Sequence, residues 1–169
     1  MDSYWFLEMP AERRFPVFTG NLEVDVAIVG GGIAGLTAAY LLSRQGLRTA
    51  LLEQEFIGGG DSGYTTAFIS HFLDNAEDTK RTWATSERAL ETIAKIVKNA
   101  KIHCDFRRLD ALAFTKRNAL SLEADYKLFL SADSILRFLE TQDAAKFCRF
   151  GAKSAILIKH EAEFHPRKY

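Results

Sequence analysis

Residues 24–53 read VDVAIVGGGIAGLTAAYLLSRQGLRTALLE and decide the fold. The apolar run 24–29 shows almost no alternation, which predicts a buried parallel strand. Apolar residues then recur at helical spacing, which predicts a helix over 33–45 that ends at Gly46. A second apolar run, 49–52, predicts a second strand, joined by the right-handed crossover that parallel strands require. The sequence therefore predicts an α/β fold built on a Rossmann-like βαβ unit.

The glycines after the first strand have the spacing Gly30-x-Gly32-x-x-Gly35, which is typical of a dinucleotide-binding turn. Gly30 allows a tight turn, Gly32 lets a pyrophosphate approach the backbone, and Gly35 lets the helix pack closely on the strand. The N–H groups at the start of the helix, those of Ile33 and Ala34 included, would face the phosphate charge. The alternative is an ordinary βαβ unit that binds no ligand.

An acidic residue ends the second predicted strand. Glu53 follows Gly35 by eighteen residues and can accept hydrogen bonds from both ribose hydroxyls of an adenosine. We assign Gln54, its neighbour, to the same site. The loop 56–70 that follows is rich in glycine and hydroxyl residues, and loops at this edge of such sheets bind ligands. Three of its side chains can donate hydrogen bonds to phosphate: Ser62, Thr65 and Thr66. The glycine turn and Glu53 would serve NAD(P) equally well, whereas this loop favours FAD.

Composition limits the other classes of function. The chain has 169 residues, which suits one domain or part of a larger protein. Lysine plus arginine and aspartate plus glutamate both number 22, so no basic excess indicates a nucleic-acid partner and no polybasic cluster indicates a membrane surface. Two cysteines, Cys104 and Cys148, form no CxxC motif, which favours reduced thiols in a cytoplasmic protein. The histidines have no metal-ligand spacing.

The flanking segments carry weaker patterns. Residues 1–23 read as an irregular arm, with Pro10 and Pro16 against regular structure. Its aromatic residues could cap a core, which is the favoured interpretation, or contact a partner. His71 could approach a flavin or be a hydrogen-bonded structural histidine. The tail 161–169 reads as polar.

Helices and short strands are predicted after residue 75. Helices are expected over 79–100, with a Glu91–Lys95 pair, over 119–130, and over 141–148, with Thr141 as N-cap and Asp143 in the first turn. Two short strands, 104–108 and 111–115, are expected to join near Asp110, and another strand covers 155–158. The segment 134–139 is ambiguous between strand and helix.

Residues 30–70, GGGIAGLTAAYLLSRQGLRTALLEQEFIGGGDSGYTTAFIS, resemble the amino-terminal flavin-binding segment of the D-amino acid oxidase-like FAD-dependent oxidoreductases. The Ser-Tyr-Trp start, the run 65–67 and the ending 163–169 resemble the subgroup that often carries a Rieske iron–sulfur domain. The resemblance implies an FAD-binding domain interleaved with a β-rich substrate domain, and an amine or amino acid as the substrate of intact relatives. It implies that the pyrophosphate contacts Gly30, Gly32 and Gly35, the ribose contacts Glu53, and Ser62, Thr65 and Thr66 line the FAD site.

Members of this family continue well beyond this length, and the two cysteines cannot form a Rieske ligand set. We therefore expect an incomplete flavoprotein, with an FAD-binding segment at 1–75 and a part of the FAD and substrate domain at 76–169. We expect no turnover from this chain alone. The alternatives are a segment of an NAD(P)-binding dehydrogenase and a non-catalytic remnant.

Overall fold

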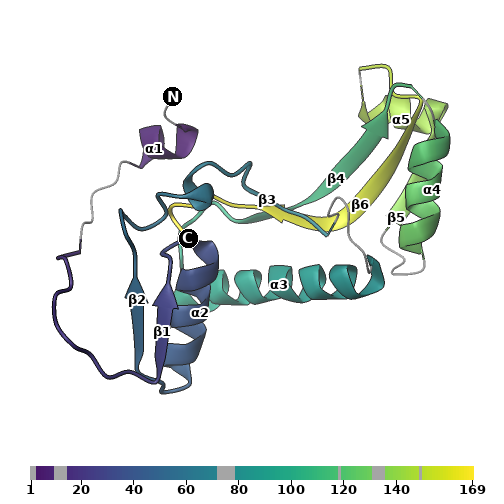
Figure 1. Cartoon of the computed structure of the whole chain (residues 1–169). Coiled ribbons are helices and arrows are strands. Elements are labelled where there is room, and N and C mark those ends of the chain that lie inside the picture. Colours follow the sequence, from purple (N-terminus) through teal and green to yellow (C-terminus); the bar gives the residue numbers. More distant parts are fainter. Residues whose placement is uncertain (1–2, 10–14, 72–78, 118, 131–135, 149) are drawn as a thin grey trace. The chain divides into compact units, whose positions relative to one another are not determined.

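A computed structural model describes residues 3–9, 15–71, 79–117, 119–130, 136–148 and 150–169. The chain divides into two compact units (Figure 1). The first unit comprises residues 1–67 and 165–169, and the second comprises residues 68–164. The boundary predicted at residue 75 lies outside the described residues, so the predicted division into 1–75 and 76–169 stays a prediction.

The first unit contains the predicted βαβ arrangement. Strand β1 (Val26–Val29) is parallel to β2 (Thr49–Leu52), and helix α2 (Ile33–Arg44) connects them. Strand β1 starts two residues later than predicted, and the amides of Asp25 and Val26 both donate to the carbonyl of Arg48 just before β2. Gly46 follows the helix with φ +84°, a conformation that glycine adopts without strain.

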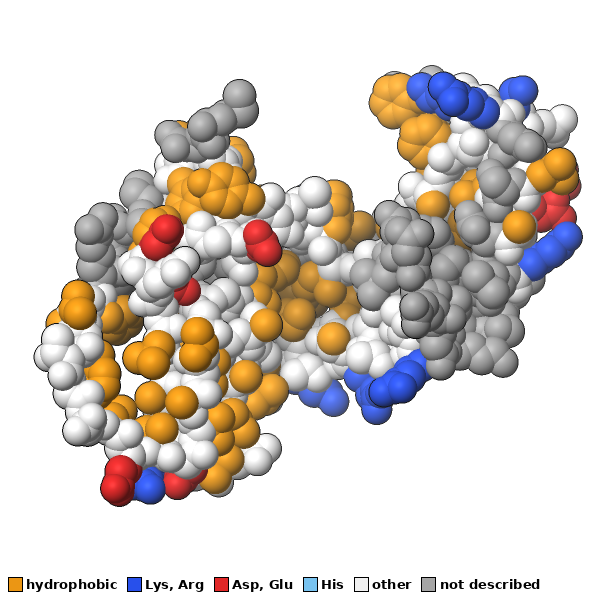
Figure 2. Space-filling view, viewed as in Figure 1, with side chains coloured by type: hydrophobic (Ala, Val, Ile, Leu, Met, Phe, Trp, Pro, Cys, Tyr) orange, Lys and Arg blue, Asp and Glu red, His pale blue; other side chains and the backbone are white. Residues whose placement is uncertain are grey.

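The prediction of a buried first strand is wrong among the described residues. Burial along β1 alternates between half-buried and exposed, and Val29 is 87% exposed. The physical reason is that this sheet has two strands and α2 packs on them from one side. Figure 2 shows hydrophobic side chains on the surface over β1 and β2.

The second unit is built around strand β6 (Ser154–Glu163). Strand β4 (Arg107–Thr115) pairs along the whole of β6, while β3 (Phe68–Ile69) and β5 (Leu136–Glu140) pair with the two ends of its other edge. All these pairings are antiparallel. Because β6 has neighbours on both edges, it forms the centre of the sheet.

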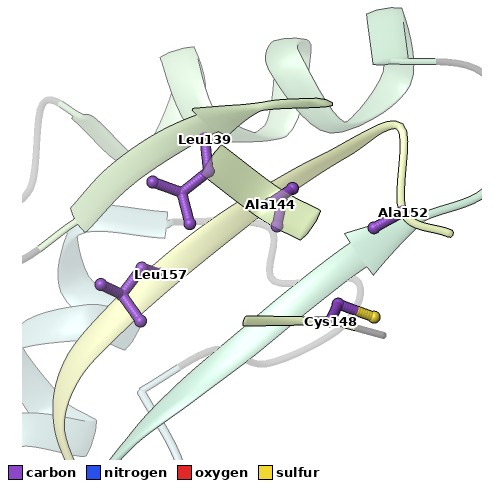
Figure 3. Packing of buried hydrophobic residues seen from close by; sticks show 6 residues of the cluster. Leu139, Ala144, Cys148, Ala152 and Leu157 are labelled. Carbon is purple, nitrogen blue, oxygen red and sulfur yellow. The ribbon is translucent and has the colours of Figure 1, made fainter. Parts of the chain in front are cut away.

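Two apolar clusters lie on opposite faces of β6, because successive side chains of a strand alternate between faces. Ile156 and Ile158 belong to one cluster, and Ala155 and Leu157 belong to the other, shown in Figure 3. Helices α3, α4 and α5 supply further members, and their bounds are Thr79–Ala100, Ala119–Leu130 and Thr141–Phe147. The bounds predicted for the first two helices are confirmed, and α5 ends one residue earlier than predicted.

Several predictions for the second unit need correction. The strands predicted at 104–108 and 111–115 are replaced by one strand, β4, which starts at Arg107, so residues 104–106 are not strand. The strand is continuous because a bulge between Leu109 and Ala111 absorbs the extra residue. The ambiguous segment is strand β5 from residue 136, and residues 134–135 lie outside the described residues. Strand β6 extends to Glu163, beyond the predicted 155–158, so part of the predicted polar tail is strand.

Two polar contacts also differ from prediction. Thr141 is the first residue of α5 and not its N-cap, and its hydroxyl donates to the carbonyl of Lys153 at 2.6 Å. Glu91 forms an ion pair with Arg108 on the neighbouring strand and not with Lys95. Across the described ranges, no helix combines the length and the hydropathy needed to cross a membrane.

The amino-terminal arm is partly helical, against expectation. Residues Tyr4–Glu8 form the short helix α1, with Trp5 and Phe6 half-buried. Phe15 and Phe18 are exposed, so the described part of the arm does not use them to cap a core. Pro10 lies outside the described residues.

Candidate dinucleotide site

The glycine turn sits between β1 and α2 in the first unit. Gly30 has φ +103°, and its amide donates to the carbonyl of Leu52 at 2.8 Å, which fixes the turn to the end of β2. A Cβ on Gly35 would lie 2.0 Å from the carbonyl oxygen of Gly30 and 3.4 Å from a methyl group of Ile28. Glycine at these two positions therefore lets α2 begin directly against the turn.

The amino terminus of α2 presents open backbone donors. The amide of Leu36 donates to the carbonyl of Gly32 and starts the helical ladder. Among the described residues, the amides of Gly32, Ala34 and Gly35 have no hydrogen-bond acceptor. Unsatisfied N–H groups at the positive end of a helix form a site that favours an anion.

Ser62 caps this helix from a distant loop. Its hydroxyl oxygen accepts a hydrogen bond of 2.9 Å from the amide of Ile33. A Cβ on Gly32 would lie 3.1 Å from the same oxygen, so the absence of a side chain at position 32 leaves room for Ser62. The hydroxyl hydrogen of Ser62 is not used in this bond and can be donated to a further acceptor.

Glu53 faces the glycine turn from the end of β2. Its Oε2 accepts from the amide of Gly31 at 2.7 Å, and its Oε1 accepts from the amide of Glu55 at 3.0 Å. The backbone N–H groups of Glu55 and Gly31 hold the pKa of the Glu53 carboxyl below its usual value. Each oxygen has a second acceptor position, so the carboxylate can also bind ribose hydroxyls.

The loop after Glu53 closes against the glycine turn through backbone contacts. The amide of Gly58 donates to the carbonyl of Gly31 at 2.9 Å. The short 3₁₀ helix Asp61–Gly63 then places Ser62 at the start of α2. A Cβ on Gly31 would lie 2.5 Å from the side chain of Ile57. Sequence reasoning did not single out Gly31, although its place in a run of three glycines was a usable signal.

The structure brings only some of the predicted site residues together at the glycine turn. The glycine turn, the start of α2, Glu53 and Ser62 lie together. The hydroxyl of Thr65 instead accepts from the amide of Ala67 at 3.2 Å, which fixes a local turn. The side chains of Gln54 and Thr66 are exposed.

His71 lies in the second unit and has structural partners there. It is 3% exposed, and its amide donates to both carboxylate oxygens of Glu161. Its Nδ1 lies 2.9 Å from Oε1 of Glu161, and its ring stacks on Trp83 with the ring centroids 5.0 Å apart. These contacts favour the structural alternative for His71. Sequence reasoning missed Glu161, because it was assigned to a polar tail.

The first unit has the features of a dinucleotide-binding βαβ unit: a strand, a glycine turn, a helix with open amides, a second strand and an acid at its end. The sequence profile of the family described as FAD dependent oxidoreductase, DAO, matches residues 25–169. The chain therefore belongs to the DAO family of FAD-dependent oxidoreductases, and FAD is the cofactor of that family.

Individual relatives agree with this assignment. YhfW of Bacillus subtilis, whose name describes a Rieske 2Fe-2S iron-sulfur protein, is 29% identical over 185 aligned residues, covering 99% of this chain and 34% of its own length. A thiamine thiazole synthase of Desulfosudis oleivorans is 38% identical, covering 53% of this chain and 39% of its own length. Among solved structures, glycine oxidase from Geobacillus kaustophilus superposes with a TM-score of 0.72 at 16% identity, covering 86% of this chain and 41% of its own. This chain thus spans about a third to two fifths of the length of these proteins.

Proposed function

We propose that this chain binds the adenosine diphosphate part of FAD at the amino terminus of α2, as the cofactor-binding portion of an oxidoreductase. The observation that carries the proposal is the group of three amides, of Gly32, Ala34 and Gly35, that have no acceptor among the described residues. A pyrophosphate offers acceptor oxygens and negative charge, which both match this helix end.

The neighbouring side chains fit the remaining parts of this ligand. Ser62 already accepts from Ile33, and it would donate its hydroxyl hydrogen to a phosphate oxygen. Glu53 stays ionised at neutral pH and would accept from the ribose hydroxyls. We assign four further residues to the proposed site because of their positions in the glycine turn and in the chain after Glu53. They are Gly30, Gln54, Thr65 and Thr66. The FAD-dependent family supports FAD over the NAD(P) alternative.

When bound, FAD supplies a ring that accepts hydride from a C–N or related bond. We propose a small amine or amino acid as the substrate, and the name of the structural neighbour glycine oxidase supports that class. We also propose a cytoplasmic location, supported by a sequence with two cysteines, both buried, and no CxxC motif. Oxygen consumption with added FAD and a panel of amines tests the expectation that this chain alone does not turn over. Sustained flavin-dependent turnover would contradict that expectation.

The site is tested by titrating the purified chain with FAD and, in parallel, with NAD⁺, and by repeating both titrations with Gly32→Val. Position 32 has φ −81° and ψ −176°, which valine tolerates, so the substitution adds bulk without backbone strain. The added side chain displaces Ser62 and covers the amides, whose bonds to a charged group are worth about 1.5–3 kcal/mol each. We expect an affinity loss of about 100-fold or more.

Gly20→Val is the matched control, because a Cβ there lies no closer than 3.7 Å to its neighbours and the position is outside the site. Equal FAD affinity for the wild type and Gly32→Val would show that the turn does not hold a phosphate. Preference for NAD⁺ over FAD would overturn the choice of cofactor.

A further inference from the structure

We propose that residues Ser3–Met9, named here the amino-terminal strap, position the loop 56–66 so that Ser62 caps α2 before the cofactor arrives. The strap contains α1 and lies in the same unit as the loop and α2. The proposal rests on the proposed function, because it adds a positioning element to the same cofactor site.

The strap holds the loop through two side-chain hydrogen bonds to its backbone. The indole Nε1 of Trp5 donates to the carbonyl of Thr65 at 2.8 Å. The hydroxyl of Ser3 donates to the carbonyl of Gly63. The two carbonyls lie one and three residues after Ser62. Fixing them therefore restricts the backbone that places the Ser62 hydroxyl.

Packing of Phe6 supplies the second contact between the strap and the loop. A Cβ on Gly63 would lie 2.4 Å from the Phe6 ring and 2.6 Å from the carbonyl oxygen of Gly58, so glycine at position 63 admits the ring. The Phe6 ring meets Phe56 edge-on at 5.7 Å and Tyr64 at 5.3 Å between centroids. The loop is thus folded around one aromatic side chain from outside its own sequence.

The segment 165–169 holds the strap from another side. The guanidinium of Arg167 lies 4.4 Å from the centroid of the Phe6 ring, and its Nε donates to the carbonyl of Met9 at 2.8 Å. Nε2 of His165 lies 3.3 Å from a carboxylate oxygen of Glu8. A five-residue helix has too few turns to be stable by itself, so these contacts keep α1 in place.

The functional consequence is preorganisation. Ser62 meets the amide of Ile33 only while the loop keeps this conformation. A loop that is ordered before binding loses less conformational entropy when the cofactor binds, which raises affinity without a direct contact to the ligand. The strap residues are therefore positioning residues and not ligands of FAD.

The experiment compares Trp5→Phe and Phe6→Ala with the wild type by two measurements. The first is FAD affinity by titration, and the second is hydrogen exchange of the Ile33 amide in the protein without cofactor. Trp5→Phe keeps an aromatic ring and removes one neutral hydrogen bond, so we expect about a fivefold loss of affinity. Phe6→Ala removes the ring that the loop surrounds, so we expect a loss of more than about tenfold. Both should speed exchange at Ile33.

Phe15→Ala is the matched control, because Phe15 is an exposed aromatic residue of the same arm and should change neither measurement. If Phe6→Ala fails to fold, Trp5→Phe alone decides the matter. Unchanged exchange at Ile33 in Trp5→Phe would overturn the positioning role. If the wild type binds no FAD, the proposed function fails, while the exchange measurement still tests the strap.

Discussion

The two units of this chain bury their apolar side chains to different degrees. In the second unit, β6 carries an apolar cluster on each face. In the first unit, the buried apolar residues among those described are Ala67 and Pro166, and α2 has no buried residue. Val29 and Leu52, at the ends of the parallel strands, are 87% and 45% exposed.

The two units are held in their local conformations by different interactions. The second unit depends on burial of apolar surface, whereas the first depends on glycine geometry and on hydrogen bonds between loops. The first unit has open amides and an uncovered sheet face. A bound ligand or further protein that covers them would therefore stabilise this unit more than the second. A ligand that binds only the folded form stabilises it by mass action.

The largest effect should come from truncating the core of the second unit. Ile156 is 1% exposed, so Ile156→Ala should lower the free energy of unfolding by about 2–5 kcal/mol. Val29→Ala removes an apolar side chain from the first unit, where it is already in solvent, and should cost less than about 0.5 kcal/mol. Urea unfolding followed by far-ultraviolet circular dichroism measures both. Equal losses of unfolding free energy in the two variants would contradict the proposed difference in apolar burial between the units.

A smaller effect should come from crowding the glycine turn of the first unit. The Cβ of Gly35→Ala would lie 2.0 Å from the carbonyl oxygen of Gly30, so α2 must move away from the turn. We expect a loss of about 1–3 kcal/mol, despite the higher helix propensity of alanine. Gly60→Ala is the control, because nothing lies within 4 Å of a Cβ there and its φ is −80°. Stability of Gly35→Ala at or above that of the wild type would show that the packing is not tight.

The smallest effect on stability should come from removing the charge of Glu53. Its pKa is lowered in the folded state by the amides of Glu55 and Gly31, so its contribution to stability is present above the unfolded value of about 4.3. That contribution is lost as the pH falls through the lower, folded value. Asp25 and Asp143 also have lowered pKa values, so the measurement is the difference between wild type and Glu53→Gln from pH 7 to pH 2. A pH-independent difference would show that the carboxylate does not hold the turn by its charge.

The βαβ unit could be predicted because its signals are local. Glycine spacing, helical periodicity and an acid after the second strand lie within thirty residues, and the structure has the expected order. The length of α3 was predictable for the same reason, since one amphipathic pattern covers it. The exposure of β1 was not, because burial depends on what covers the sheet and not on the strand's own residues.

The missed parts of the candidate site are contacts between segments far apart in sequence. Ser62 was predicted to face a phosphate, but its role as acceptor for Ile33 depends on how the loop folds back. Trp5 and Thr65 are sixty residues apart, and no periodicity connects them. The same holds outside the candidate site, where the buried Glu161 of the second unit pairs with His71, ninety residues away. Single-sequence patterns hold no information on such pairs.

We propose that the adenosine diphosphate part of FAD binds at the start of α2. Titration of isotope-labelled chain with FAD, followed by amide chemical shifts in nuclear magnetic resonance, tests it most directly. We expect the largest shifts at Gly32, Ala34 and Gly35, with smaller ones near Glu53 and Ser62. Shifts confined to residues 79–164, or none at millimolar FAD, would contradict the claim.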